Sequence, residues 1–155
     1  MILREVRDED LDVLFEHWRD PESNRMAAFA PADPSDREAF DARWARLRAN
    51  LDATNRTIEV DGKVVGTIAS WTQEGGDREV TYWLGREHWG KGLATRALAA
   101  FLEIEMARPL HAAAAADNAG SIRVLEKCGF TRAGGARGFA NARGEEIDEV
   151  LFLLR

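Results

Sequence analysis

Cysteine is almost absent from this sequence: Cys128 is the only one among 155 residues. No disulfide can therefore form within the chain, which is typical of a protein from a reducing compartment. The sequence also has no apolar run near the roughly 20 residues that a membrane-spanning helix requires. Its first ten residues, MILREVRDED, show no signal-peptide pattern. We therefore expect a cytoplasmic protein without a membrane partner.

Basic residues are outnumbered, with 21 Lys and Arg against 27 Asp and Glu and a formal net charge of −6. Surfaces that bind nucleic acid are normally basic, so we expect no nucleic-acid partner. The charge is compatible with a cationic partner such as an amine, although a solvated acidic surface is the simpler explanation. The length and the 45% of hydrophobic residues predict one domain, residues 1–155, with its own core.

The spacing of apolar residues changes along the chain and predicts both helices and strands. Seven strands are expected at residues 2–6, 56–60, 63–71, 78–84, 109–116, 130–135 and 146–154. Four helices are expected at residues 8–20, 35–50, 92–108 and 119–128. Ser35 is the expected cap of the second helix, and Ile104 is expected on the buried side of the third. The proline-rich segment 21–34 is interpreted as a loop with at most one helical turn.

The stretch GREHWGKGLAT, residues 85–95, predicts a loop whose backbone amides bind an anion at the start of a helix. Read from Gly85, it resembles a nucleotide phosphate loop. However, Gly92 stands where that loop needs a hydroxyl for magnesium, and Thr95 lies most of a helical turn further on, so an NTPase is disfavoured. Read from Gly90, it lacks the third glycine and the later acidic residue of a dinucleotide site. The pyrophosphate of coenzyme A, which needs no metal, is the remaining option.

Two segments, YWLGREHWGKGLATRAL and ADNAGSIRVLEKCGF, resemble the GNAT superfamily of N-acetyltransferases. They are most similar to the branch that acetylates the amino termini of ribosomal proteins. The family's pyrophosphate signature, Q/R-x-x-G-x-G/A, falls on residues 89–94, with Trp89 in place of the usual Gln or Arg. A second block matches Asn118, Ser121, Gly129 and Phe130. The resemblance covers the whole chain, and the element order β-α-α-β-β-β-α-β-α-β-β agrees with it.

The resemblance implies a single α/β domain with a mixed, mostly antiparallel sheet of about seven strands flanked by four helices. It implies acetyl-CoA as cofactor, no metal, and direct attack of a primary amine on the thioester in a ternary complex. The amine would belong to a small molecule or a protein amino terminus, and the enzyme would be a monomer or a homodimer. The residues expected to contact the cofactor are Trp83, Leu84, Gly85, Trp89, Gly90, Lys91, Gly92, Leu93, Ala94, Thr95, Asn118, Ser121 and Lys127.

Ser121 and Glu79 are the candidate catalytic residues. Many relatives protonate the departing thiolate with a tyrosine at a position that is Leu125 here, and the only tyrosine of this chain is Tyr82, in a strand. The resemblance implies that Ser121 serves instead, and capping of the helix is its alternative role. The resemblance implies that Glu79 accepts the proton of the amine through a water molecule. Its alternative explanation is an exposed strand glutamate.

Other polar and aromatic residues give weaker signals. Glu74 is a second candidate base, His88 is expected near phosphate or at the surface, and His111 is expected to be a packed histidine. Cys128 is expected to pack rather than react, and Trp71 is a candidate for the lining of an acceptor pocket. Because the usual tyrosine is missing, a catalytically silent acyl-CoA-binding or sensing module is the alternative function.

Overall fold

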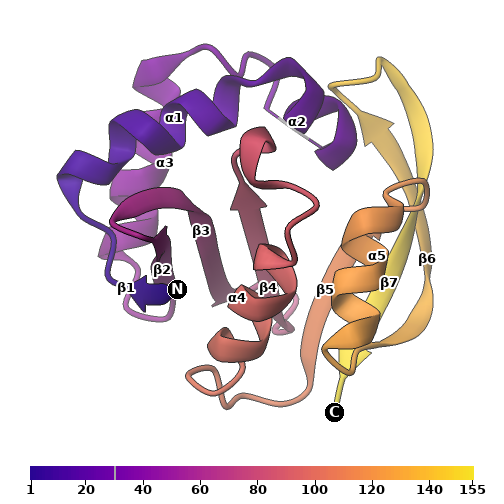
Figure 1. The fold of residues 1–155 in the computed structure, drawn as a ribbon. Coiled ribbons are helices and arrows are strands. Elements are labelled where there is room, and N and C mark those ends of the chain that lie inside the picture. Colours follow the sequence, from indigo (N-terminus) through magenta and orange to yellow (C-terminus); the bar gives the residue numbers. More distant parts are fainter. Residues whose placement is uncertain (30) are drawn as a thin grey trace.

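The computed structural model describes residues 1–29 and 31–155. Seven strands form one sheet in the order β1-β2-β3-β4-β5-β7-β6 (Figure 1). The strands are β1 (Ile2–Arg4), β2 (Thr54–Val60), β3 (Lys63–Thr72), β4 (Arg78–Leu84), β5 (Leu110–Ala115), β6 (Thr131–Ala140) and β7 (Glu145–Leu154). In the described ranges the α-helices are α1 (Leu11–Arg19), α2 (Pro21–Ala27), α3 (Arg37–Ala49), α4 (Leu93–Phe101) and α5 (Ala119–Lys127). Two 3-10 turns, η1 (Asp8–Asp10) and η2 (Arg86–His88), precede α1 and α4.

The sheet is antiparallel everywhere except between β4 and β5, which run parallel. This confirms the predicted α/β fold with a mixed, mostly antiparallel sheet. The predicted hairpin between β2 and β3 is also confirmed, with φ of 51° at Asp61 and 79° at Gly62. Positive φ at both central residues is what a two-residue hairpin turn of type I′ requires.

Within residues 1–29 and 31–155 there is one α-helix more than the four predicted, because residues 21–27 of the expected loop form α2. Asp20 caps this helix, and its carboxylate accepts a hydrogen bond from the backbone N–H of Ser23 at 2.9 Å. Pro21 occupies the first helical position, where a backbone N–H has no partner within the helix, so the lack of one costs no hydrogen bond. The proline therefore marks a helix start here, not a loop.

Several other boundaries also differ from the prediction: β1 ends at Arg4 and not at residue 6, and β6 continues to Ala140 and not to residue 135. Two differences at helices have a physical reason in the contacts of their ends. Helix α4 ends at Phe101, and Ile104, which was expected to be buried, is 42% exposed. The chain leaves the helix here because Glu105 turns toward the sheet, where its carboxylate pairs with the Arg78 guanidinium at 2.7 Å. Helix α3 is capped by Asp36, which accepts from the Ala39 N–H at 3.0 Å, and not by Ser35.

Apolar clusters lie on both faces of the sheet. The larger one packs α4 and α5 against the strands and includes Phe101, Leu125 and Phe152. The smaller one joins α1 and α3 through Phe15 and Phe40. None of the helices in the described residues has the length and apolar character needed to cross a membrane.

Candidate active site

The parallel strands β4 and β5 separate in the middle of the sheet. They pair only at Arg78 with Leu110 and at Glu79 with His111, although both strands continue beyond these residues. A cleft of about 1000 Å³ lies at this point, and it is lined by the free ends of both strands, by η2, and by α-helices on both sides. An unpaired strand edge has N–H and C=O groups available, so an extended ligand can bind there as an additional strand.

The strand β4 divides the cleft into two sides because its successive side chains point to opposite faces of the sheet. Val80 and Leu84 belong to the cluster under α4 and α5, and Tyr82 packs against that cluster. Glu79, Thr81 and Trp83 alternate with these residues and therefore point to the face that α1 covers. Both sets line the cleft, apart from Val80.

The first side of the cleft ends at the glycine-rich loop before α4. Gly90 and Gly92 have φ of 74° and 75°, which only glycine adopts without strain, and Gly92 is the N-cap of α4. A Cβ at either position would have no atom within 4 Å, so the loop is open toward the cleft. The first amides of α4 have no partner within the helix, so this end of the cleft favours an anion. The Trp89 indole N–H ties the loop to β4 by donating to the Leu84 carbonyl at 3.3 Å.

Nearly all the residues expected to contact the cofactor line this one cleft, and Gly85 and Lys91 are the two that do not. The lining includes Lys127 as well as the loop and strand residues. Packing explains why residue 85 is a glycine: a Cβ there would lie 2.5 Å from Nε2 of the buried His17 imidazole. Its backbone still continues the free edge of β4, so its contact with the cofactor stays a prediction.

Ser121 lies near the start of α5, but it does not cap the helix. The cap is Asn118, whose Oδ1 accepts from the Ser121 backbone N–H at 3.2 Å and whose Nδ2 donates to the Met26 carbonyl at 3.3 Å. The Ser121 hydroxyl is therefore free for another partner, and that partner is the Tyr82 hydroxyl at an O–O distance of 2.8 Å.

Tyr82 is a candidate functional residue that no sequence motif indicated. It lies on β4, partly buried, and burial raises the pKa of its phenol to about 12, against a smaller opposing effect from the Ser121 hydrogen bond. The phenol is thus a neutral hydroxyl at physiological pH. Strand alternation could have revealed it, because Val80, Tyr82 and Leu84 share the face that carries α5.

Glu79 lies on the other side of the cleft, between Trp71 of β3 and His111 of β5. Burial raises the pKa of Glu79, the neighbouring Glu149 raises it further, and His111 opposes both. Glu149, on β7, also lines the cleft, and burial raises the pKa of its carboxyl. Glu79 is therefore not an exposed strand residue, and Glu149 is a second carboxylate that no sequence motif indicated.

Several weaker candidates lie elsewhere. His111 is half-buried and its Nε2 lies 3.6 Å from the Asp77 carboxylate. Burial raises the pKa of Cys128, whose thiol donates to the Thr95 carbonyl at 3.5 Å, so an unreactive packing role agrees with its surroundings. Trp71 lines a smaller space beside the main cleft. Glu74 does not line the cleft.

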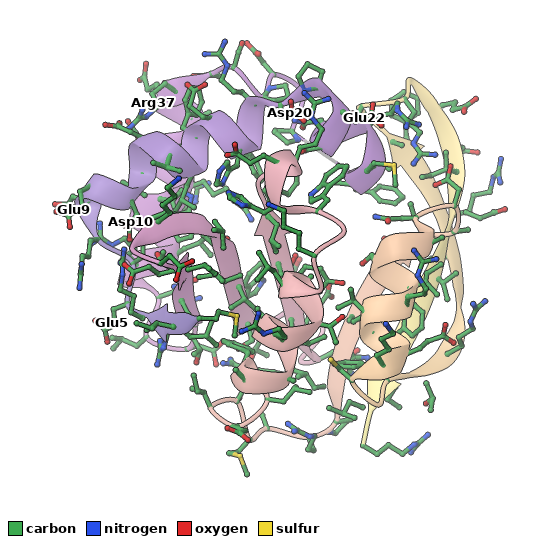
Figure 2. All side chains as sticks on the ribbon, viewed as in Figure 1. Glu5, Glu9, Asp10, Asp20, Glu22 and Arg37 are labelled. Carbon is green, nitrogen blue, oxygen red and sulfur yellow. The ribbon has the colours of Figure 1, made fainter. Side chains whose placement is uncertain are left out.

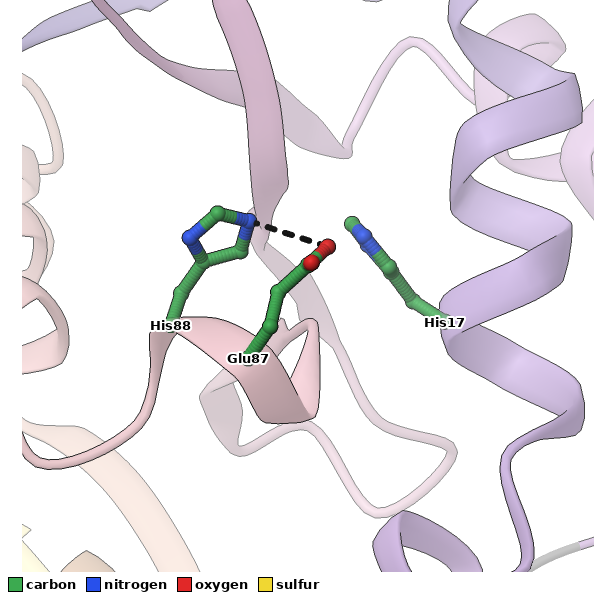
Figure 3. A group of neighbouring side chains, drawn as sticks. All are labelled: His17, Glu87 and His88. Atoms are coloured by element: carbon green, nitrogen blue, oxygen red, sulfur yellow. Dashed lines mark ion pairs between the residues drawn. The ribbon is translucent and has the colours of Figure 1, made fainter.

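His17, Glu87 and His88 form a group beside the cleft whose possible ligand atoms all lie within 4.8 Å of one another (Figure 3). His88 Nε2 is 3.4 Å from the Glu87 carboxylate. Burial, and then the nearby His88, lower the pKa of His17, which is consequently neutral. Two imidazoles and a carboxylate are a ligand set that suits zinc. The ring of His17 also has a packing role, because it fills the space beside Gly85.

Comparisons with known proteins agree with this geometry. Residues 1–131 match the family described as "Acetyltransferase (GNAT) domain". The chain is 32% identical to "Uncharacterized N-acetyltransferase p20" of Bacillus licheniformis, over 99% of this chain and 92% of the relative. It is also 32% identical to "Putative ribosomal N-acetyltransferase YdaF" of Bacillus subtilis, over 76% of this chain and 68% of the relative.

A solved structure shows the same fold over nearly the full length. It is the ribosomal-protein-alanine N-acetyltransferase from Brucella melitensis, which superimposes with a TM-score of 0.84 at 23% identity and covers 99% of both chains. The family match, the relatives and the split sheet with its glycine-rich loop lead to one conclusion. This chain belongs to the GNAT family of acetyltransferases.

Proposed function

We propose that this protein transfers the acetyl group of acetyl-CoA to a primary amine, by direct attack in a ternary complex of enzyme, cofactor and amine. The observation that carries the proposal is the cleft at the split of β4 and β5. It has an anion-binding loop and a pair of hydroxyls on one side, and a carboxylate on the other. An acyl donor and an amine can therefore approach the same strand edge from opposite faces.

The loop and strand edge supply the binding of the cofactor. The amides at Gly90 and Gly92 and the start of α4 would hold the diphosphate, and the free edge of β4 at Trp83–Gly85 would hold the pantetheine arm. Acetyl-CoA itself supplies the reactive thioester. A backbone N–H of the β4 edge is suited to stabilise negative charge on the carbonyl oxygen during attack.

The Tyr82 and Ser121 hydroxyls supply a proton donor for the leaving thiolate. When Tyr82 donates to Ser121 Oγ, the Ser121 proton is free to point toward the thiolate, and the phenol compensates for the charge left on the serine oxygen. A thiol has a pKa of about 8.5, so it needs only modest help to leave as the neutral form or as a stabilised anion. This pair is our candidate for the role that the missing tyrosine at Leu125 has in relatives.

Glu79 supplies the acceptor side with a base. The raised pKa of Glu79 lies closer to the pKa of an ammonium group, so its carboxylate is better matched for proton transfer than an ordinary glutamate. An α-amino group has a pKa near 8 and a lysine amine about 10.4, so an amino terminus would require the weaker base. The neighbouring Glu149 adds negative charge that favours a cation on this face.

The test is thiol release from acetyl-CoA in the presence of a panel of primary amines and peptides, with the slow hydrolysis without amine subtracted. We expect amine-dependent release together with the acetylated amine as product. Binding of acetyl-CoA without amine-dependent release from any acceptor would instead support the silent acyl-CoA-binding module.

A further inference from the structure

Arg43 of α3 is a partly buried cation with no anionic partner. No hydrogen bond or ion pair to its guanidinium is found within residues 1–29 and 31–155. Two other arginines of the helix are paired: Arg37 with Asp41 at 2.8 Å and Asp12 at 2.9 Å, and Arg48 with Asp8. Arg37 extends from the outer side of the helical layer (Figure 2).

The surroundings of Arg43 disfavour its charge. Burial lowers the pKa of its guanidinium, and the nearby Arg46 lowers it further. The planar group lies 5.2 Å from the centre of the Trp18 ring, which orients it without neutralising it. An ionised group that is partly removed from water and unpaired is destabilising, so an anion bound to Arg43 would relieve this cost.

Arg43 lies on the acceptor side of the cleft. It lines the cleft together with Thr81 and Trp83, which share the Glu79 face of β4. Trp18, under its guanidinium, packs on Trp83 with ring centres 4.9 Å apart. Arg46, which also lines the cleft, is a second cation next to it. The acceptor side therefore has cations on α3 and carboxylates on β4 and β7.

Nearby carboxylates are already engaged in local contacts. Asp33 and Asp36 line the same cleft, but Asp33 accepts from the Ser35 N–H and hydroxyl, and Asp36 caps α3. The phosphates of the cofactor are assigned to the loop before α4, on the opposite face of β4, where Arg123 and Lys127 of α5 also line the cleft. Arg43 is thus left for an anion of the other substrate.

We infer that the amine acceptor carries its own anionic group, which binds Arg43 and Arg46 while its ammonium group binds at Glu79. The substrate class is a primary amine with a carboxylate or a phosphate-like group, either as a free amino acid or as an amino-terminal peptide with an acidic residue. This inference rests on the proposed function and specifies its acceptor.

The experiment compares matched acceptors. Amino acids of increasing chain length, from glycine to ω-aminohexanoate, are assayed beside alkylamines of equal length and aminoalkylphosphonates. Two peptides with free amino termini, differing only by glutamate or glutamine, distinguish a peptide acceptor from a small one. We expect at least one anionic acceptor to exceed its uncharged counterpart in kcat/KM.

Three variants assign this preference to the arginine. Arg43→Gln should lower kcat/KM for the anionic acceptor by about 10- to 100-fold, the loss typical of a charged hydrogen bond, and Arg43→Lys should lower it less. The kcat/KM for the uncharged amine and the KM for acetyl-CoA should each change less than about twofold. Arg48→Gln, on the same helix but outside the cleft, is the control and should behave as the parent. An equal loss for charged and uncharged amines, or a raised KM for acetyl-CoA, would overturn the inference.

A calorimetric titration separates this inference from the proposed function. The best anionic acceptor is titrated into the protein saturated with CoA, and no turnover is needed for the readout. Binding that Arg43→Gln abolishes supports the anion site even if no amine is acetylated. Equal binding to the parent and to Arg43→Gln overturns it, whatever the activity assays give.

Discussion

The Tyr82 and Ser121 hydroxyls form one hydrogen-bonded pair in the lining of the cleft. The motif indicated Ser121, but a sequence gives no distance, and capping and catalysis were equally compatible with its position. The structure assigns the cap to Asn118 and brings the Tyr82 hydroxyl to 2.8 Å from Ser121. The contact joins residues 39 positions apart, so only the packing of α5 on β4 could reveal it.

Removing the Ser121 hydroxyl should slow the chemical step while acetyl-CoA still binds. We expect Ser121→Ala to lower kcat by about 100-fold, because general acid help is usually worth at least that much. Tyr82→Phe should lower kcat by less, and the double variant should be no slower than Ser121→Ala because the two hydroxyls act as one unit. Steady-state kinetics at saturating amine measure this.

Asn118→Ala is a comparison for stability and not for activity, because Asn118 is itself an expected cofactor contact. Removing this helix cap should lower the melting temperature through a loss of about 1 kcal/mol. Parent turnover by Ser121→Ala would show that the proton comes from another group.

We expect the protein with Glu79 to be more active but less stable at neutral pH than the Glu79→Gln variant. Because burial and Glu149 raise its pKa in the folded state, the folded protein binds the proton more tightly than the unfolded chain does. Stability therefore falls as the pH rises from the unfolded pKa through the folded one, and the ionised carboxylate is destabilising at neutral pH. Glu79→Gln should melt at a higher temperature than the parent at pH 7. Below the pKa of the glutamate in the unfolded chain, the two proteins should melt at the same temperature.

The same substitution should remove the base. We expect kcat/KM to fall by about 100-fold or more. In the parent, kcat/KM should rise with pH through the raised pKa of Glu79, and the variant should lose that limb of the profile. Glu74→Gln, outside the cleft, is the control. An unchanged rate with an unchanged pH profile would return Glu79 to a plain strand residue.

At the scale of elements, the sequence predicted which helices and strands exist better than it predicted where they begin and end. The hairpin, the alanine-rich β5 and the helix after Gly92 were predicted because turn residues and flanking breakers are local signals. Helix α2 was missed because Asp20 and Pro21 are typical of both turns and helix starts, and the difference lies in a hydrogen bond to Ser23. The end of α4 depends on the contact of Glu105 with Arg78, 27 positions away in the chain.

The loop before α4 gives a prediction about the element as a whole. A side chain at Gly92 meets two obstacles, the left-handed φ of 75° and the diphosphate that its amide would contact. Gly92→Ala should lower stability by about 1–2 kcal/mol for the left-handed backbone and should weaken acetyl-CoA binding by at least about tenfold. Gly62→Ala isolates the first effect, because Gly62 has φ of 79° and equally open surroundings in the hairpin turn.

Thermal melting and calorimetric titration of both variants separate the two effects. Gly62→Ala should melt early and bind acetyl-CoA as the parent does. Equal affinities of Gly92→Ala and Gly62→Ala would place the pyrophosphate elsewhere.

At the scale of the whole molecule, the fold could be predicted because local signals and two motifs agreed along the chain. The division of the cleft into two sides, which we propose for the cofactor and the acceptor, could not be predicted, because it depends on where β4 and β5 stop pairing. Residues from α3, β4 and β7 converge there, among them Arg43, Glu79 and Glu149. No spacing in the sequence relates these three residues, since the sheet order places β7 beside β5.

The same whole-molecule reasoning predicts how the enzyme responds to metals. Gly92 stands where a nucleotide phosphate loop has its magnesium ligand, and acyl transfer develops no phosphoryl charge for a cation to stabilise. We expect the rate of amine-dependent thiol release to be unchanged by a chelator and by added magnesium. Loss of activity in chelator with recovery in magnesium would favour phosphoryl chemistry. Loss of activity in chelator with recovery in zinc alone would instead assign a functional metal to His17, Glu87 and His88, whose ligand atoms lie close enough to share one ion. In that case His88→Ala should not recover activity in zinc, whereas His111→Ala should.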